Sequence, residues 1–203
     1  MAVRDHSLDD NIIESARKEF LTYGYKSASI NQIARNAGVT TGALYIRYTN
    51  KDDLFASLVQ DAMNELVRRE KTAADMYYQV HSRADLELFL LAMEEEMNIY
   101  VDVIFRYYDQ CVLLFCKSRG SSVWAMLEKG MEHKARTTVE FLEGLSHKKL
   151  TGVELLVRQQ AGLIGLILDA GYDREQTMDA MKRLYAFNRA GWRDLFEKEL
   201  GAK

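Results

Sequence analysis

Proline is absent from this chain of 203 residues, although average usage of about 5% would supply roughly ten. The proline ring fixes φ and removes a backbone donor, so a mostly helical chain avoids it. Its absence favours an all-α fold of long helices joined by short links. The composition, 48% hydrophobic and 28% charged, excludes wholesale disorder.

Cysteine is also scarce, since Cys111 and Cys116 are the only two. Five residues apart on a helix, they point in different directions, so no disulfide between them is expected. Reduced thiols predict a cytoplasmic protein. The first ten residues contain no apolar core, so no signal peptide is expected. The longest apolar run, residues 161–168, is far shorter than the roughly 20 residues that span a bilayer, so no membrane contact is expected.

The net charge of −3 hides an uneven distribution. Residues 17–51 carry a net charge of +5, whereas residues 52–203 carry −5. A basic segment on an acidic body is typical of a nucleic-acid-binding module joined to a second unit. Charge alone leaves an ordinary solvated face as an equal alternative.

Two short helices joined by a tight turn are predicted within the basic segment. Ser29 precedes the first helix and Thr40 the second, and each hydroxyl is suited to cap its helix. Small Ala34 lets the two helices cross closely, Gly38 permits the positive φ of a sharp turn, and Leu44 fills the space between them. This is the helix-turn-helix pattern, in which the second helix enters the major groove of DNA.

Other helices follow from apolar periodicity. Gly24 is expected to end the first helix as a C-terminal cap. Further helices are expected over residues 124–145, 153–170 and 174–199, and residues 86–115 form a helix that either continues or kinks.

Several motifs surround the helix-turn-helix pattern: Phe20-Leu-Thr-Tyr-Gly-Tyr25, Ile33-Ala34, Ala37-Gly38-Val39, Gly42-Ala-Leu-Tyr45, Tyr48, Lys51 and Asp53-Leu54. In this order and spacing, the first 60 residues or so resemble the N-terminal DNA-binding domain of TetR-family regulators. The resemblance implies a three-helix helix-turn-helix domain over residues 1–50, followed by a larger helical ligand-binding and dimerisation domain over residues 51–203. Ile46 and Arg47 depart from common family residues, so the operator sequence is not transferred from a relative.

Residue chemistry and the resemblance together predict the DNA contacts. Helix N-termini favour phosphate, the first turn of a recognition helix approaches base edges, and an Arg pairs with guanine or phosphate. For each polar residue the alternative is a helix cap or a solvated position. The candidates are Ser29, Asn31, Gln32, Thr40, Thr41, Gly42, Tyr45, Arg47 and Lys51.

Aromatic and methionine side chains are concentrated between residues 93 and 124. Apolar walls with a few hydroxyl groups are typical of small-molecule pockets, although ordinary core packing explains each position equally simply. The candidate effector-binding residues are Met93, Met97, Tyr100, Tyr107 and Trp124.

The last two predicted helices are apolar over a broad width, which indicates a partner beyond their own core. The family resemblance implies that they form a four-helix bundle across a homodimer axis. The candidate interface residues are Leu156, Gln160, Ile164, Gly165, Leu168, Met181, Tyr185, Asn188 and Trp192.

Enzyme chemistry has little support in the sequence. The four histidines have no metal-ligand spacing, and there is no phosphate-binding glycine loop. No catalytic residue, metal or cofactor is expected. The sequence therefore predicts a ligand-responsive transcriptional repressor, a homodimer on a pseudo-palindromic operator with a small-molecule effector. A helical enzyme or metal-binding bundle with a coincidental helix-turn-helix pattern is the alternative, and an activator or ligand-independent regulator would share every feature.

Overall fold

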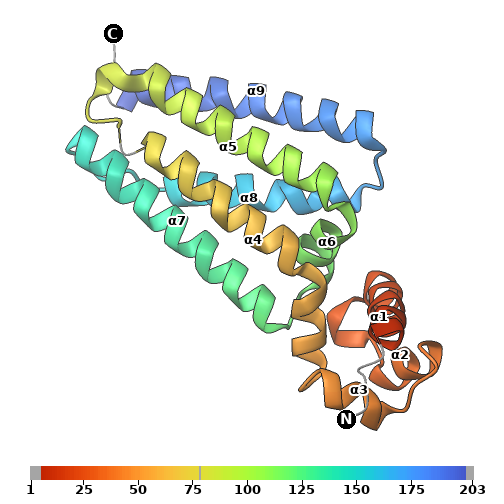
Figure 1. Ribbon diagram of the computed structural model, residues 1–203. Helices are drawn as coiled ribbons and strands as arrows, with labels where there is room; N and C mark the ends of the chain where they lie inside the picture. The colour runs from red at the N-terminus through yellow and green to blue at the C-terminus, as the bar shows by residue number, and fades with distance from the viewer. Residues whose placement is uncertain (1–5, 78, 200–203) are drawn as a thin grey trace.

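The computed structural model describes residues 6–77 and 79–199. This part of the chain is helical throughout and contains no strand, so the predicted all-α fold is confirmed (Figure 1). The elements in chain order are α1 (His6–Ser27), α2 (Ile30–Asn36), α3 (Thr41–Arg47), α4 (Lys51–Tyr77), η1 (Arg83–Asp85), α5 (Leu86–Arg106), α6 (Tyr108–Val112), η2 (Leu113–Lys117), α7 (Ser122–Ser146), α8 (Val153–Asp169) and α9 (Arg174–Glu199).

The first helix does not end where the sequence predicted. Gly24 has φ 71° and ψ 168°, outside the helical region, but the helix resumes and continues to Ser27. The glycine therefore kinks α1 instead of capping it, because a residue with no Cβ adopts positive φ at little cost.

The small N-terminal unit packs onto the start of α4. Phe55 of α4 meets Phe20 and Tyr25 of α1 edge to face, with ring centroids 5.0 and 5.3 Å apart. Such aromatic pairs stabilise a core beyond the area that they bury. The core of this unit thus extends past residue 50 into the first turns of α4.

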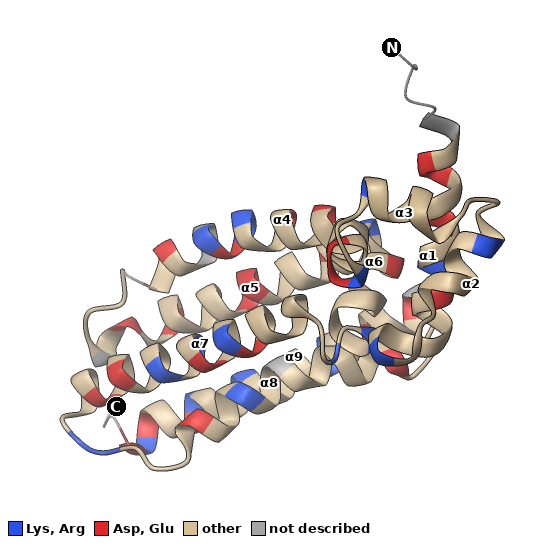
Figure 2. Ribbon diagram, turned by 90° about the horizontal axis from the view of Figure 1, so that it is seen from below, with Lys and Arg blue, Asp and Glu red and all other residues tan. Residues whose placement is uncertain are grey.

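The helical body holds a second core. Phe89 of α5 contacts Trp192 and Phe196 of α9, and Leu142 of α7 and Val153 of α8 complete this cluster. Figure 1 shows α5 lying beside α9 along most of its length, with α4, α7 and α8 on the other side. Charged residues of both signs are interspersed along these helices (Figure 2).

The predicted helix over residues 86–115 is broken. Tyr107 has φ −128° and ψ 45°, which ends α5, and the chain turns through α6 into the π-helical turn η2. This turn brings η2 against α1. Among the described residues, no helix has both the length and the apolar character needed to cross a membrane.

Candidate nucleic-acid interface

The helix-turn-helix forms as its local chemistry predicts. The Ser29 hydroxyl accepts a hydrogen bond from the Gln32 amide at 3.3 Å, and the Thr40 hydroxyl accepts one from the Ala43 amide at 3.1 Å. Both caps satisfy amides that the helix itself leaves free. Gly38 has φ 70° in the turn between α2 and α3. The expected caps and turn are therefore confirmed.

One side of α3 is buried and the other is open. Leu44 is fully buried against the N-terminal core, whereas Gly42, Tyr45 and Ile46 are exposed on the opposite side. Ile46 is 85% exposed. The sequence had a signal for it, since Ile46 lies outside the apolar stripe of its helix.

Asn31 and Thr41 lie next to each other across the turn. The Thr41 hydroxyl donates to the Asn31 side-chain oxygen at 3.3 Å, and the Gln32 amide group donates to Asn36 at 2.8 Å. These polar groups gather where α2 and the start of α3 meet, on the exposed side. Their contact with DNA stays a prediction.

Arg47 does not project from the open side of α3. Its Nε donates to a carboxylate oxygen of Asp9 on α1, and one terminal nitrogen donates to the Ala43 carbonyl at 3.2 Å. The Arg47 side chain is only 16% exposed. The guanidinium thus joins α3 to α1, which removes most of its capacity to bind a base or phosphate.

Lys51 is likewise held by the protein. Its ammonium donates to the carbonyls of Lys26 and Ala28, at 3.2 and 2.8 Å, and lies 5.0 Å from the centroid of the Tyr25 ring. Burial lowers the pKa of Lys51, while the nearby Glu19 carboxylate opposes that shift. Lys51 therefore neutralises the carbonyl end of α1, where cations are favoured.

The predicted effector-binding residues do not share one site. Met93 packs in the core of the helical body, whereas Tyr107 packs in the cluster that continues into the N-terminal unit. Fourteen residues of helix separate them by about 21 Å. Trp124 lies at the start of α7, where its ring meets the Arg119 guanidinium at 5.4 Å. Met97 and Tyr100, one turn apart on α5, remain close to each other.

A partly buried polar cluster, which the sequence did not predict, lies beside Tyr100. The Tyr100 hydroxyl donates to Glu70 of α4, and the Tyr77 hydroxyl donates to Glu96 of α5 at 3.1 Å. Lys134 of α7 forms an ion pair with Glu96. Three helices therefore contribute charged or hydroxyl groups to one interior region. The sequence signal was Lys134, a lysine on the inner side of an amphipathic helix. Periodicity alone predicts that such a lysine is solvated.

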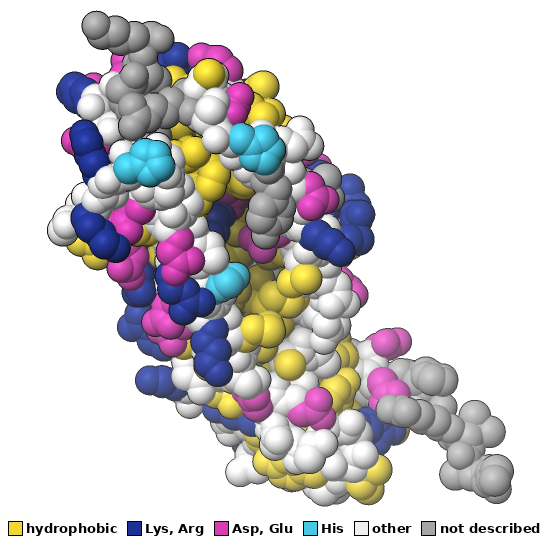
Figure 3. Space-filling model, turned by 90° about the vertical axis from the view of Figure 1, so that its left-hand side faces the viewer, with side chains coloured by type: hydrophobic (Ala, Val, Ile, Leu, Met, Phe, Trp, Pro, Cys, Tyr) yellow, Lys and Arg dark blue, Asp and Glu magenta, His cyan; other side chains and the backbone are white. Residues whose placement is uncertain are grey.

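The Lys134 side chain is half-buried. Burial lowers the pKa of Lys134 to about 8, yet 43% of the side chain remains accessible to water. The face at the left of Figure 1 is hollowed, with hydrophobic side chains inside and charged ones around them (Figure 3).

Most of the predicted dimer contacts are directed into the chain's own core. Ile164, Leu168, Met181 and Trp192 are buried within the protomer. A Cβ on Gly165 would meet the Phe115 carbonyl at 3.4 Å, so that glycine allows close packing within the chain. These five residues pack within their own chain, and their contact with a second copy stays a prediction.

Other apolar residues on the last two helices are exposed. Leu155 and Leu166 are exposed on α8, and Phe187 is 74% exposed on α9. Leu156 is the one predicted interface side chain that is largely exposed, while Gln160 and Asn188 are partly buried.

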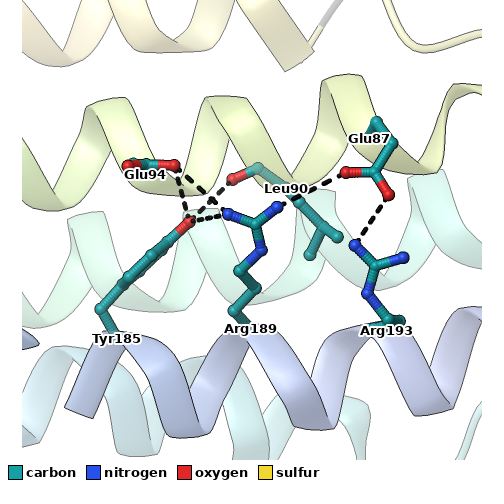
Figure 4. Close-up of polar contacts among 6 residues, drawn as sticks. All are labelled: Glu87, Leu90, Glu94, Tyr185, Arg189 and Arg193. Carbon is teal, nitrogen blue, oxygen red and sulfur yellow. Dashed lines mark hydrogen bonds and ion pairs between the residues drawn. The ribbon is translucent and has the colours of Figure 1, made fainter. Parts of the chain in front are cut away.

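Tyr185 faces α5 within the chain. Its hydroxyl contacts the Glu94 carboxylate at 3.1 Å, and Arg189 reaches both Glu94 and Glu87 (Figure 4). Arg193 pairs with Glu87 at 2.7 Å. These polar contacts attach α9 to α5 along successive turns, so Tyr185 stabilises the protomer.

Metal and thiol chemistry find no support in the described residues. No group of three or more His, Cys, Asp or Glu side chains is placed to hold a metal ion there. Both cysteines are free, and burial raises the pKa of Cys111 to about 12 and that of Cys116 to about 11. A thiol with a raised pKa carries little thiolate and reacts slowly.

Known proteins resemble this chain most clearly at its N-terminus. The sequence model of the family described as bacterial regulatory proteins, tetR family, matches residues 12–58. The uncharacterized HTH-type transcriptional regulator YhgD of Bacillus subtilis (strain 168) is 28% identical over 80 residues, which are 39% of this chain and 42% of that protein. The probable acrEF/envCD operon repressor of Escherichia coli (strain K12) is 28% identical over 99 residues, 46% of this chain and 45% of that protein. Each match thus spans less than half of the relative's length.

The whole fold has solved counterparts. The crystal structure of a TetR-like transcriptional regulator from Rhodococcus sp. RHA1 superimposes with a TM-score of 0.59 and 16% identity. The superposition covers 94% of this chain and all of that one. At this identity the likeness concerns the arrangement of helices alone.

Proposed function

Because the chain belongs to the TetR family of bacterial regulatory proteins, we propose that it is a ligand-responsive transcriptional repressor that binds a pseudo-palindromic operator as a homodimer. It acts in the cytoplasm, where bacterial DNA lies. The exposed side of α3 is the observation that carries the proposal. This side presents a bare glycine, a tyrosine hydroxyl and an apolar Ile46 in a turn-linked helix of the kind that enters the major groove.

Phosphate binding falls to groups at the helix starts. Ser29, Asn31 and Gln32 lie at the N-terminus of α2, and Thr40 and Thr41 lie at that of α3. Their amides and hydroxyls suit backbone phosphates, which position the protein without reading sequence. Lys51 contributes a positive field at the same end of α4 even while its ammonium holds α1.

A second copy is needed to read a pseudo-palindrome. Leu155, Leu166 and Phe187 support the dimer, because large apolar side chains exposed on two neighbouring helices mark a surface that associates. A two-fold axis would place equivalent α3 helices on half-sites a whole number of DNA turns apart.

The effector is proposed to bind among the central helices beside Met97 and Tyr100. Support comes from the mixture of apolar walls with the hydroxyls of Tyr77 and Tyr100 and the ammonium of Lys134. The same α4 that begins beside the helix-turn-helix carries Tyr77 at its far end. A ligand that tilts this continuous helix would change the spacing of the two α3 helices, and hence operator affinity.

The first test is a gel shift of the full chain with the DNA that flanks its own gene. A shift that survives excess random DNA is expected. If cognate and random DNA compete equally, the regulator proposal fails and the helical enzyme or metal-binding bundle becomes the better hypothesis. Transcription from that DNA distinguishes a repressor from an activator. It should rise in the absence of the protein if the protein is a repressor, and fall if it is an activator.

The effector is tested with a compound found by thermal-shift screening of the full chain. Operator affinity should fall about 5- to 150-fold in its presence, the range of ordinary allosteric coupling. By reciprocity, operator DNA must weaken compound binding by the same factor. A compound that stabilises the protein without changing operator affinity would contradict the α4 mechanism.

A further inference from the structure

A hollow lies where α1 meets the body. It is an open recess of about 280 Å³ between residues 22–26 at the end of α1 and the segment around Cys116, Lys117 and Arg119. Figure 1 shows α1 adjoining the α6–η2 region here. The hollow therefore spans the junction between the DNA-binding unit and the helical body.

Three cationic side chains line this hollow, and its lining includes no carboxylate. They are Lys26 of α1, Lys117 at the end of η2 and Arg119 in the loop that follows. Within residues 6–77 and 79–199, none of the three forms an ion pair with a carboxylate. Like charges that share a concave surface repel, so the hollow favours an anion.

The protein holds two of these cations in place. A Cβ on Gly120 would lie 2.6 Å from Cε of Lys26, so the stem of Lys26 lies directly on that glycine. The Arg119 guanidinium lies over the Trp124 ring. Side chains held in this way lose less freedom when they bind a ligand.

The nearby carboxylates have other partners. Asp52 accepts a hydrogen bond from the Ser122 amide at 2.9 Å and another from Tyr25, which together lower its pKa. Asp169 lies near enough to Cys116 to raise its pKa, yet it does not line the hollow. Neither carboxylate neutralises the three cations.

We propose that this hollow binds a small molecule that carries a phosphoryl or diphosphoryl group. Lysine ammonium groups act as point charges for phosphate oxygens, and the arginine guanidinium offers paired donors to them. The volume suits a compact metabolite, since ligand pockets usually begin near about 300 Å³. Tyr23, which is 60% exposed on the rim, offers an aromatic face to a planar group on the same molecule.

Bound phosphate would join two parts of the chain. It would pair with Lys26 of the DNA-binding unit and with Lys117 and Arg119 of the body at once. This part of the inference rests on the proposed function, because it predicts a change in operator affinity. The binding of the anion itself does not depend on DNA.

The test is calorimetric titration of the full chain with sodium pyrophosphate at constant ionic strength. Saturable binding to one site per chain is expected. The double variant Lys117→Ala with Arg119→Ala should bind at least about tenfold more weakly, since a lost charge-assisted hydrogen bond costs roughly 1.5–3 kcal/mol. The control, Lys129→Ala with Lys182→Ala, removes two exposed lysines outside the hollow and should bind as the wild type does.

Lys26→Met gives a second measurement should the double variant fold poorly, because it removes the charge but keeps a stem over Gly120. Equal pyrophosphate binding by the wild type, both pocket variants and the control would overturn the proposal, as would no saturable binding. A third outcome is that pyrophosphate does not bind but DNA binding by the pocket variants depends less on salt than that of the wild type. The cations would then contact the DNA backbone, and the proposal would be wrong. If the chain binds pyrophosphate but has no affinity for operator DNA, the anion site is supported and the proposed function is contradicted.

Discussion

Ile46 is the most exposed large apolar residue among the described part of the chain, and it lies on the open side of α3. In the major groove, the C5-methyl group of thymine is the apolar feature that such a side chain can recognise. Arg47 is held against Asp9, so we expect its exposed neighbours on α3 to make any direct contacts with bases. At the residue scale, we therefore expect operator specificity to depend more on shape and apolar contact than on guanidinium pairing.

We predict that Ile46 reads one thymine methyl group. Operator duplexes in which each thymine in turn is replaced by deoxyuridine should reveal one position where affinity falls about fourfold, because burying a methyl-sized group is worth about 0.8 kcal/mol. Ile46→Ala should bind that operator more weakly and should not respond to the replacement there. If the variant stays as sensitive as the wild type, Ile46 does not read the base.

The Arg47–Asp9 ion pair is predicted to act on stability. Both side chains are more than three-quarters buried, so a double-mutant cycle of Arg47→Ala and Asp9→Ala should give a coupling free energy of unfolding on the order of 1 kcal/mol. Asp9 makes further contacts, so only the cycle isolates the pair. Urea denaturation measures it. If the coupling free energy is zero and only Arg47→Ala loses operator affinity, Arg47 contacts DNA directly.

At the element scale, the enclosed polar cluster of α4, α5 and α7 is the unusual feature. Most of the body is held by apolar packing, whereas here Lys134 lies among Glu96, Glu70 and two tyrosines. Enclosing the charged ammonium costs free energy, because protein surroundings solvate it less well than water does. Such a cost makes the packing of these three helices depend on pH.

The pKa of Lys134 predicts the sign of that dependence. It is about 8 in the folded chain, below the ordinary 10.5, because burial penalises the charged form. Between these values the unfolded chain binds more protons, so the free energy of unfolding should rise with pH relative to Lys134→Met. Urea denaturation between pH 7 and 9.5 measures this difference. This pH range lies below the pKa values of Tyr77 and Tyr100, which burial raises. A flat difference across this range would mean that water solvates the ammonium fully.

At the scale of the whole molecule, α8 and α9 expose large apolar side chains, and we expect these to set the oligomeric state. Leu166 is 67% exposed and Phe187 74%, and neither has a role in the protomer's core. By contrast, α9 is already attached to α5 through Trp192 and the polar contacts of Figure 4. The protomer therefore keeps its fold while this surface remains available.

We predict that Leu166→Asp with Phe187→Asp yields a monomer. Charges buried at an apolar interface without partners are strongly unfavourable, so association should be lost while helical content remains. Sedimentation velocity at micromolar concentration measures the mass, and circular dichroism checks the fold. Val67→Asp, at a similarly exposed apolar position on α4, is the control and should remain dimeric. A monomeric wild type, or a dimeric double variant, would contradict the assignment of this surface.

Local features of the fold could be predicted because they depend on residues close together in the chain. The hydroxyls of Ser29 and Thr40 each accept a hydrogen bond from the amide three residues later, and the turn at Gly38 needs only the positive φ of that glycine. The ends of α9 follow from a long periodic segment in the same way. Gly24 shows the limit, since a glycine permits a kink and a cap equally, and contact with η2 selected the kink.

The sequence by itself determined an all-α chain with a capped helix-turn-helix in a basic segment, because caps, turns and periodicity act over a few residues. Only the tertiary structure decided which partner each side chain meets. Periodicity states that Trp192 and Met181 have an apolar side to bury, but not whether their own chain or a second copy covers it. Likewise, the sequence alone leaves Arg47, Lys51 and Lys134 as available cations, whereas in the fold each contacts an acceptor from a distant segment of the chain. The physical reason is that burial and ion pairing depend on segments far apart in sequence, whose positions are set only when all the helices pack together.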